Sequence, residues 1–379
     1  MRYGQAMESR GASGDGKIRV CALVPYPAGI TPSQRYRIEQ WRPILISEGI
    51  EVELWPFLEE RELELLYSSK GWPDKARMVS RATARRCRAV ARLEEFDVVL
   101  IHRAACLAGP AFLERLIARR KPIVYDFDDA IYLLDTTVQN RIFGWLKFPR
   151  KTATLCRISR QVVAGNHHLA RYARRHNANV MVVPSSIDVE RYAPLPKPHR
   201  ADRVVIGWTG SATSQAHLES FTPVLRRIWE RHGVEIHVVS AHPPQLGGVP
   251  SRWKRWTADR EVEDLAEFDI GIMPLPDDEW ARGKSAFKAL QCMGMAVPVV
   301  CSSVGASLDL IQHGENGFLA STPDEWVENL GRLISDRSLR DRVGRAGRRT
   351  VERTYSALAS ARALARVLRA ASGETGVCA

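Results

Sequence analysis

The sequence predicts two α/β domains, each built on a parallel sheet, that face each other across a cleft. A chain of 379 residues is too long for one ordinary core and suggests two domains of roughly 150 to 200 residues each. Apolar runs alternate with helical spacing along both halves, and residues 189–202, with three prolines among charges, separate them. With 45% apolar and 26% charged residues, the composition is that of a globular protein.

The first half opens with a strand, a helix and a second strand. Residues 17–25 form a continuous apolar run typical of a buried parallel strand, and the loop after it contains Gly29. Residues 33–48 have the spacing of one amphipathic helix, which Gly49 closes, and residues 50–57 read as the second strand. This order predicts a right-handed βαβ crossover.

Two further apolar runs of the first half end in polar side chains. FDVVLIHR ends beside His102, and KPIVYDFDD ends at Asp126, Asp128 and Asp129. Ligands of open parallel sheets bind beyond the carboxyl ends of the strands, so these side chains form a candidate site. The carboxylates fit a divalent cation, the hydroxyls of a sugar, an amine, or a plain helix cap, and a lone histidine is as often structural as catalytic.

A second set of strand and helix units begins at residue 203. Residues 203–211 read as a strand that runs into a turn at Gly210 and Ser211, and residues 217–233 have helical spacing. Gly29 and Gly210 hold equivalent places in the two halves. Glycine there lets a ligand approach the backbone, or it merely closes a tight turn.

Residues 268–319 carry the strongest functional signal. An apolar strand stops at a proline-rich loop, a helix is predicted to start at Gly283, Lys284 and Ser285, and a second apolar strand follows. Free N–H groups, the positive end of the helix dipole and a nearby lysine together suit a phosphate. Lys284, Lys288 and Gln291 are spaced to share one helix face, whose alternative interpretation is a solvated surface.

The formal charge is +12, and arginine supplies 45 of the 55 basic residues. This charge favours an anionic partner, which leaves nucleic acid, a membrane surface and phosphorylated metabolites as candidates, or else it reflects solvated helix faces. Aromatic platforms and nucleic-acid-binding motifs are missing from the sequence, so nucleic acid is not expected. Arg35 and Arg37 are expected on a solvated face, with an anionic ligand as the alternative.

The seven cysteines are scattered without metal-binding spacing, which favours a reduced cytoplasmic protein. No apolar segment has the length of a signal peptide or of a membrane span. A Ser/His/Asp order, a zinc signature and a phosphate-binding P-loop motif are all missing, which disfavours hydrolases, metalloenzymes and P-loop proteins.

The segment GKSAFKALQCMGMAVPVVCSSVGASLDLIQHGENGFLA resembles the donor-binding segment of the family 4, or group 1, glycosyltransferases. VVPSSIDVERYAP, IGWTGS and AGNHHLARYA are further points of similarity, and the resemblance extends over residues 17–358. It implies the GT-B fold, in which two Rossmann-like domains close on a nucleotide sugar. The second domain then holds the donor and the first holds the acceptor, and transfer is usually retaining and independent of metal or other cofactors.

The pattern and the resemblance together define the expected site. The amides around Lys284, Ser285 and Ala286 would hold the distal phosphate, and Gly210 and Ser211 would lie near the pyrophosphate. The expected donor-binding residues are Gly29, Gly210, Ser211, Arg282, Gly283, Lys284, Ser285, Ala286, Phe287, Lys288 and Gln291. Asp126 or Asp128 is the expected base or acceptor-orienting group, and His102 is expected to contact the donor sugar.

The chain departs from the family in two places. The paired glutamates of the family, eight positions apart, would fall on Gly283 and Gln291, and the usual arginine and lysine after the second glycine turn are missing. Gln291 is expected to bond a ribose hydroxyl without contributing charge, and Lys284 or Arg282 to replace the missing cations. A divergent branch of the family, or a degenerate binding protein, fits this pattern.

The expected domain limits follow from these segments. A disordered N-terminus covers residues 1–16, the acceptor domain 17–190, a linker 191–202 and the nucleotide-sugar domain 203–352. A helix within residues 353–379 is expected to pack back on the first domain. The expected partners are the donor and a glycan, lipid-linked or small-molecule acceptor, with peripheral contact to the inner membrane face as a supplement.

Overall fold

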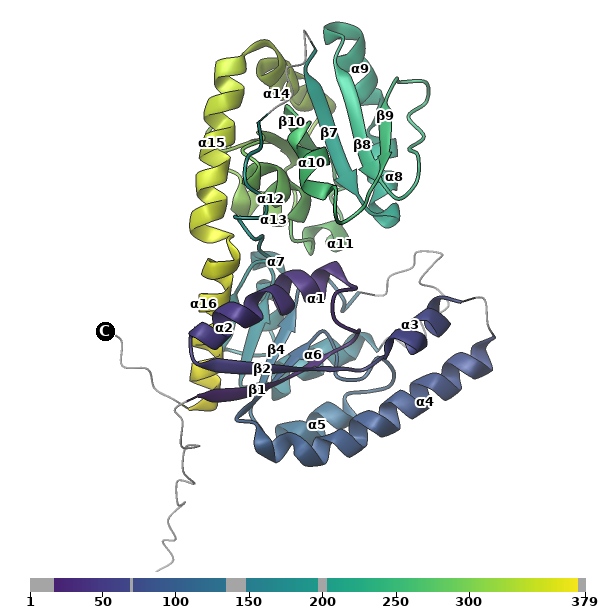
Figure 1. Ribbon diagram of the computed structural model, residues 1–379, viewed down its shortest axis with the longest axis vertical. Helices are drawn as coiled ribbons and strands as arrows, with labels where there is room; N and C mark the ends of the chain where they lie inside the picture. Colours follow the sequence, from purple (N-terminus) through teal and green to yellow (C-terminus); the bar gives the residue numbers. More distant parts are fainter. Residues whose placement is uncertain (1–16, 69–70, 134–147, 197–202, 374–379) are drawn as a thin grey trace, which may run out of the picture.

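The computed structural model describes residues 17–68, 71–133, 148–196 and 203–373 and confirms two α/β domains, one above the other in Figure 1. Residues 1–16, predicted to be disordered, lie outside the described residues, as do residues 197–202 of the predicted linker.

The first domain is built on a six-stranded sheet in the order β2-β1-β3-β4-β5-β6, in which every pairing is parallel. Five consecutive residues are buried in each of the central strands β3 and β4, as expected for strands covered by helices on both faces. The strands are β1 Ile18–Val24, β2 Ile50–Pro56, β3 Val98–His102, β4 Ile123–Phe127, β5 Gln161–Ala164 and β6 Val180–Val182.

Helices cover both faces of this sheet. One face packs on α4 to α7, and the other packs on η1, α2 and the C-terminal helix α16. The helical elements before the second domain are α1 Pro32–Arg37, η1 Glu39–Trp41, α2 Arg42–Ser47, α3 Glu60–Tyr67, α4 Trp72–Ala89, η2 Val90–Glu95, α5 Phe112–Ala118, α6 Pro149–Ile158 and α7 His167–Arg174.

The single helix predicted over residues 33–48 is wrong, because the segment forms α1, the 3₁₀ turn η1 and α2. Ile38 leaves the helical region at φ −125°, and Pro43 stands in the first turn of α2. A proline has no N–H to donate to the preceding turn, so one continuous helix cannot pass through it undisturbed. The break turns Arg37 inward, where it is fully buried, instead of onto the predicted solvated face.

The second domain holds a parallel sheet in the order β12-β11-β10-β7-β8-β9. Its central strand β7 is buried up to the glycine turn at its end. The strands are β7 Val205–Gly210, β8 Glu235–Ser240, β9 Arg252–Arg255, β10 Ile270–Met273, β11 Val299–Ser302 and β12 Phe318–Ala320.

The helices of this domain again form two layers. One face of the sheet packs on α8, α9 and α14, and the other packs on α10, α12 and α13, while α15 contributes to both cores. The helices are α8 Ala212–Ser220, α9 Thr222–His232, α10 Glu261–Ala266, α11 Glu279–Arg282, α12 Phe287–Gly294, α13 Ala306–Leu310, α14 Pro323–Ser335, α15 Arg337–Thr354 and α16 Ala357–Ser372.

Helices α15 and α16 run along one side of the molecule and join the two domains a second time (Figure 1). Ser356 caps α16 by accepting from the Ala359 N–H, and Leu364 and Leu368 of α16 are buried against the first sheet. The chain therefore returns to the domain in which it began.

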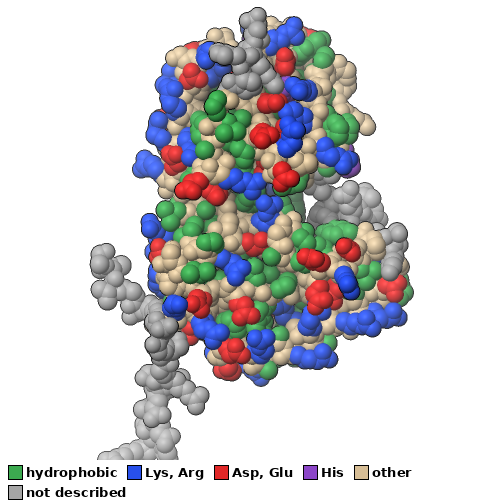
Figure 2. Space-filling view, in the orientation of Figure 1, with side chains coloured by type: hydrophobic (Ala, Val, Ile, Leu, Met, Phe, Trp, Pro, Cys, Tyr) green, Lys and Arg blue, Asp and Glu red, His purple; other side chains and the backbone are tan. Residues whose placement is uncertain are grey.

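The charged side chains are distributed over the surface of both domains. On the face shown in Figure 2, lysine and arginine side chains are interspersed with aspartate and glutamate over both domains. No helix in the described part of the chain combines the length and apolar character that crossing a bilayer requires.

Strand order changes direction between β1 and β3 in the first sheet, and between β7 and β10 in the second. Loops diverge to opposite faces of a sheet at such a switch point and leave a crevice beyond the strand ends. In the first sheet the loops are those after Val24 and His102, and in the second those after Gly210 and Met273. All four loops contribute residues to the site.

Candidate functional site

A cavity of about 560 Å³ lies between the domains, at the two switch points. Both domains contribute to its wall, since Tyr26 and Arg103 follow β1 and β3, while Ser211 and Leu275 follow β7 and β10. The lining residues are Tyr26, Thr31, Pro32, Ser33, Tyr36, Tyr67, Arg103, Asp128, Asp129, Ser185, Ser211, Ser214, Met273, Leu275, Lys284, Ser285, Ala286, Phe287 and Lys288.

The wall from the second domain suits an anion. In the described part of the chain, the N–H groups of Ser285, Ala286 and Phe287 donate to no backbone carbonyl or side chain of the protein. Ala286, the N-cap of α12, adopts a left-handed conformation with φ 53°, and such backbone strain recurs at ligand sites. Helix α12 thus begins at the cavity with its first donors unused.

The predicted helix start at residues 283–285 is wrong by a few positions. Helix α11 ends at Arg282, and α12 begins at Phe287, because the loop between them turns through the left-handed Ala286. The Lys284 N–H donates to the Ala281 carbonyl at 3.0 Å and is not available to a ligand. Lys284 therefore precedes the helix whose face it was predicted to share.

Lys284 and Lys288 supply positive charge to this wall. Neither makes an ion pair within the described ranges, and the Lys288 ammonium lies 4.4 Å from the centre of the Trp208 ring. Burial, together with repulsion from Lys284, lowers the pKa of Lys288 to about 7. An anion beside the two ammonium groups would relieve their repulsion and restore charge to Lys288.

The first domain contributes two carboxylates to the cavity wall, and an arginine pairs with both of them. The Arg103 guanidinium donates to Asp128 Oδ1 at 2.8 Å and to Asp129 Oδ2 at 2.6 Å. Burial opposes the charge of Asp128, yet Arg103 lowers the pKa of that carboxyl well below its usual range, whereas burial raises the pKa of Asp129. Arg103 itself has φ 61°, a second strained position at the cavity.

Asp126 lies behind this wall instead of in the cavity. It is 1% exposed, and its carboxylate accepts from Arg37 Nε at 3.1 Å and from His102 Nδ1 at 2.6 Å. Burial alone would raise the pKa of Asp126, but Arg37 and His102 hold it below its ordinary value. Asp126 does not border the cavity and both of its oxygens are engaged inside the protein, so its role as base or acceptor-orienting group stays a prediction that this geometry does not favour.

His102 is likewise 1% exposed and does not line the cavity. Its Nε2 lies 2.8 Å from the hydroxyl of Ser33, which does line the cavity. The structure therefore separates His102 from the direct sugar contact expected for it. Of the three expected catalytic residues, Asp128 alone borders the cavity.

The three predicted glycines serve packing and turns. Gly29 has φ +83° and donates its N–H to Glu39, and a Cβ on Gly210 would lie 2.4 Å from the Trp208 ring. A Cβ on Gly283 would lie 2.8 Å from the Ala130 Cβ of the other domain. None of the three lines the cavity, so their predicted donor contacts are not seen.

Gln291 and Arg282 also lie elsewhere than predicted. Gln291 Nε2 is buried and donates to Glu261 Oε1 at 2.9 Å and to the Tyr192 hydroxyl at 3.1 Å, away from the cavity lining. Arg282 pairs with Asp277 and Glu279 beside a different cavity, of about 420 Å³. The predicted ribose contact of Gln291 and the predicted phosphate contact of Arg282 are not supported by this geometry.

Direct contacts hold the domains together around the cavity. The rings of Tyr36 and Phe287, one from each domain, lie 4.2 Å apart between centres. Asn166 Nδ2 donates to the carbonyls of Arg282 and Lys284, both at 3.1 Å, and so connects the first domain to the lysine-bearing loop. The acidic and basic walls are thereby held opposite each other.

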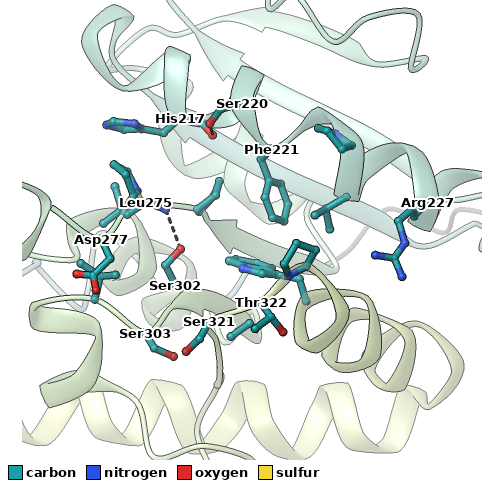
Figure 3. A pocket seen from close by; sticks show the side chains of 18 residues that line it. His217, Ser220, Phe221, Arg227, Leu275, Asp277, Ser302, Ser303, Ser321 and Thr322 are labelled. Carbon is teal, nitrogen blue, oxygen red and sulfur yellow. Dashed lines mark hydrogen bonds between the residues drawn. The ribbon is translucent and has the colours of Figure 1, made fainter.

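Figure 3 shows a further cavity, of about 430 Å³, within the second domain. It lies beyond the ends of β10, β11 and β12, and Leu275, whose N–H donates to Ser302 Oγ at 2.9 Å, borders both this cavity and the interdomain one. The basic side chain in its wall, Arg227, pairs with Asp324 at 2.8 Å. The lysines without a carboxylate partner border the interdomain cavity instead.

Ser33, Thr31, Tyr36 and Arg103 line the cavity and were not among the predicted site residues. They follow the ends of β1 and β3, in the next loop or the first helix, and polar residues after strand ends are the signal that could have found them. Ser211, Lys284, Ser285, Ala286, Phe287 and Lys288 were predicted and line the cavity.

Comparison with known proteins finds a family match within the second domain. Residues 203–336 match the family model described as glycosyl transferases group 1. Over 101 residues the chain is 32% identical to the capsular polysaccharide biosynthesis glycosyltransferase CapM of Staphylococcus aureus. That match spans 26% of this chain and 26% of CapM, about a quarter of the length of each.

Solved structures match the whole fold. A glycosyltransferase from Rickettsia africae superposes with a TM-score of 0.66 at 12% identity, over 94% of this chain and 98% of its own. HepE of Anabaena, in complex with UDP and glucose, superposes with a TM-score of 0.65 at 15% identity, over 93% of this chain and 100% of its own. Identities this low show the fold alone, and the fold is the predicted GT-B arrangement.

Proposed function

Because residues 203–336 match the family model of the group 1 glycosyl transferases, we propose that the protein transfers a sugar from a nucleotide-sugar donor to a hydroxyl acceptor. The donor binds mainly to the second domain and the acceptor mainly to the first. The acceptor class is a glycan, a lipid-linked sugar or a small natural product.

The observation that carries this proposal is the anion-binding wall of the interdomain cavity. Lys284 and Lys288 border the cavity without a carboxylate partner among the described residues, beside the unused amides that begin α12. Departure of the sugar leaves negative charge on a diphosphate, and fixed N–H dipoles and ammonium groups stabilise such charge where it develops. The arrangement suits a diphosphate leaving group.

We further propose that transfer is retaining and needs no divalent cation. The lysines and the amides at the start of α12 supply positive charge in the place where a cation would otherwise act. The carboxylates of Asp128 and Asp129 are both bonded to Arg103, which competes with a metal ion for their oxygens. Unchanged turnover in the presence of a chelator is expected, and the configuration of the product by NMR tests retention.

The names of similar proteins support the choice of substrate. HepE binds UDP and glucose, and CapM serves capsular polysaccharide biosynthesis, so a UDP-sugar and a polysaccharide acceptor are the first to test. We place the protein in the cytoplasm, with its arginine-rich faces in contact with the inner membrane surface, as liposome flotation would test.

The test begins with binding. Calorimetry with UDP-glucose, GDP-mannose and ADP-glucose should give saturable binding of one of them, and mass spectrometry should then detect a product that gains one hexose when cell extract supplies acceptors. Absence of saturable binding by all three donors, and by a wider panel of nucleotide sugars, would refute the proposed function.

A second function, binding of a nucleotide sugar without transfer, has one observation in its favour. Both positions of the family's paired glutamates lack a carboxylate, and Gln291 lies outside the cavity lining. Under this alternative the donor binds but neither water nor any extract component takes the sugar. The same experiment therefore separates the two functions.

A further inference from the structure

Three side chains from separate elements form a hydrogen-bonded chain that leads from the cavity wall into the protein. The Ser33 hydroxyl of α1 lies 2.8 Å from His102 Nε2 at the end of β3, and His102 Nδ1 lies 2.6 Å from Asp126 Oδ2 on β4. Ser33 lines the cavity, whereas His102 and Asp126 are each 1% exposed. Ser33 is thus the point at which a buried histidine and carboxylate reach the ligand space.

The charges around the chain fix the direction of its hydrogen bonds. Arg37 keeps Asp126 ionised, so the carboxylate accepts and His102 Nδ1 carries a proton. A neutral His102 then has a free lone pair on Nε2, to which the Ser33 hydroxyl donates. The remaining lone pairs of Ser33 Oγ are available to a donor in the cavity.

A hydroxyl of a bound substrate is such a donor. Nearby, Thr31 Oγ1 is buried at the cavity and has no hydrogen-bond partner among the described residues, which leaves a second polar atom for the same ligand. Lys284 and Lys288 belong to the second domain and Ser33 and Thr31 to the first, so the wall suited to an anion and the wall suited to a hydroxyl belong to different domains. An acceptor hydroxyl between Ser33 and the donor sugar would donate a hydrogen bond to Ser33 Oγ, while the diphosphate of the donor lies against the lysine wall.

We propose that Ser33 is a catalytic residue that accepts a hydrogen bond from the attacking hydroxyl and relays its proton to His102. This inference rests on the proposed function, because it assigns the acceptor side of the transfer. His102 and Asp126 act through Ser33 and are positioning residues. Arg37 positions Asp126 in turn.

The proton and bond changes balance within this arrangement. The acceptor oxygen bonds to the anomeric carbon on the face from which the diphosphate departs, while the bond from that carbon to the diphosphate oxygen breaks. The acceptor proton passes to Ser33 Oγ, and the original Ser33 proton passes to His102 Nε2. The imidazolium is stabilised by the Asp126 carboxylate, and its proton leaves with the diphosphate or to water when the products depart.

The experiment uses the full chain and measures release of nucleoside diphosphate from UDP-glucose, GDP-mannose and ADP-glucose, with water or cell extract supplying the hydroxyl. Ser33→Ala should lower kcat about 10²-fold, the order expected for losing general-base assistance, while the donor Kd changes less than about twofold. Ser33→Thr, which keeps a hydroxyl, should recover part of the rate. Ser47→Ala on α2, whose hydroxyl bonds only the Ile44 carbonyl, is the matched control and should behave as wild type.

A double-variant test checks that the two residues act together. His102→Gln should lower kcat by a similar factor, and Ser33→Ala with His102→Gln should lose no more than the single variants, because both remove one relay. Multiplied losses, or a folded Ser33→Ala with kcat within about threefold of wild type, would overturn the relay.

The experiment distinguishes failure of the proposed function from failure of the relay. If the wild-type protein binds none of the donors, glycosyl transfer itself is refuted and the relay falls with it. If the wild type turns over and Ser33→Ala merely lowers the melting temperature, the hydroxyl is structural and only the relay is overturned.

Discussion

The Arg37 guanidinium lies against the Asp126 carboxylate, with Nε 3.1 Å from Oδ2, and both side chains are almost wholly buried. Arg37 also donates to the Val183 carbonyl at 2.8 Å, so it links α1 to β4 and to the residue that follows β6. Buried ion pairs are costly to break because the remaining charge loses its partner. The pair holds the Asp126 carboxylate in place, and Asp126 in turn positions His102, which contacts Ser33.

Replacement of Arg37 by methionine should therefore destabilise the protein by about 3 to 5 kcal/mol. The lowered pKa of Asp126 means that its ion pairing stabilises the fold above about pH 4, the ordinary value, and that this stabilisation is lost as the pH falls below it. The difference between wild type and Arg37→Met should narrow on acidification. Urea unfolding followed by circular dichroism, at neutral and acid pH, measures both effects.

Arg35→Met on the same helix is the control. Arg35 is partly exposed and makes a cation–π contact with Tyr36. Arg35→Met should therefore destabilise the protein by about 1 kcal/mol at most, well under the effect of Arg37→Met. Equal destabilisation by the two variants would contradict the importance assigned to the buried pair.

Lys288 should take up a proton when a diphosphate binds. Its pKa of about 7 leaves it largely neutral at pH 8 in the free protein, and a neighbouring phosphate should raise that pKa and recharge it. Binding should therefore absorb up to about one proton and weaken as the pH rises above 7. Calorimetry at pH 8 in buffers of different ionisation enthalpy measures the uptake directly.

Lys288→Met should abolish this proton uptake, and Lys17→Met, at an exposed position paired with Glu51, should retain it. An uptake that is unchanged in Lys288→Met would assign the proton to another group and contradict the role given to Lys288.

Gln291→Glu should destabilise the protein, although it restores a carboxylate that the family carries. The new carboxylate would replace an amide that donates to Glu261 at 2.9 Å and would place two buried like charges together. The expected cost is about 1 to 3 kcal/mol, and it should diminish below about pH 5 as one carboxyl becomes protonated. Thermal unfolding across pH measures it.

Gln312→Glu, at an exposed position after α13, is the matched substitution and should change stability by less than about 0.5 kcal/mol. If Gln291→Glu proved as harmless as this control, Glu261 would not explain why glutamine stands at position 291.

Gly283→Ala should disturb the closed arrangement of the domains. The added Cβ would lie 2.8 Å from the Ala130 Cβ and backbone nitrogen, and overpacking of this kind costs about 1 to 3 kcal/mol. Slower turnover and a larger radius of gyration by X-ray scattering are expected. A Cβ added at Gly331 in α14 would lie 3.5 Å from the far end of His232, so Gly331→Ala should leave the turnover and the radius of gyration unchanged.

Much of the fold could be predicted from the sequence because it depends on local patterns. The apolar runs at 17–25 and 121–129 are buried strands, and the placement of polar residues after strand ends correctly indicated where a cavity forms. Lys284 and Lys288 were found because a lysine near a helix start is a recognisable phosphate signal.

The errors came from contacts between residues far apart in the sequence. No residue near Arg37 in the sequence indicates that it pairs with Asp126, 89 positions later, in the core. No residue near Gln291 indicates its hydrogen bond to Glu261. Ser33 and His102 are 69 positions apart, so their hydrogen bond is invisible to any sequence order of serine, histidine and aspartate. Local pattern located the cavity, while tertiary contacts decided which side chains face it.

The most direct test of the account is the donor dissociation constant of Lys284→Ala, measured by calorimetry beside wild type and the control Lys17→Ala. Lys284 lines the cavity without a carboxylate partner among the described residues, so its loss should remove a charge-assisted contact worth about 1 to 3 kcal/mol. The account predicts binding about 5- to 150-fold weaker for Lys284→Ala and no change for Lys17→Ala. A dissociation constant that stays at the wild-type value in a folded Lys284→Ala would contradict it.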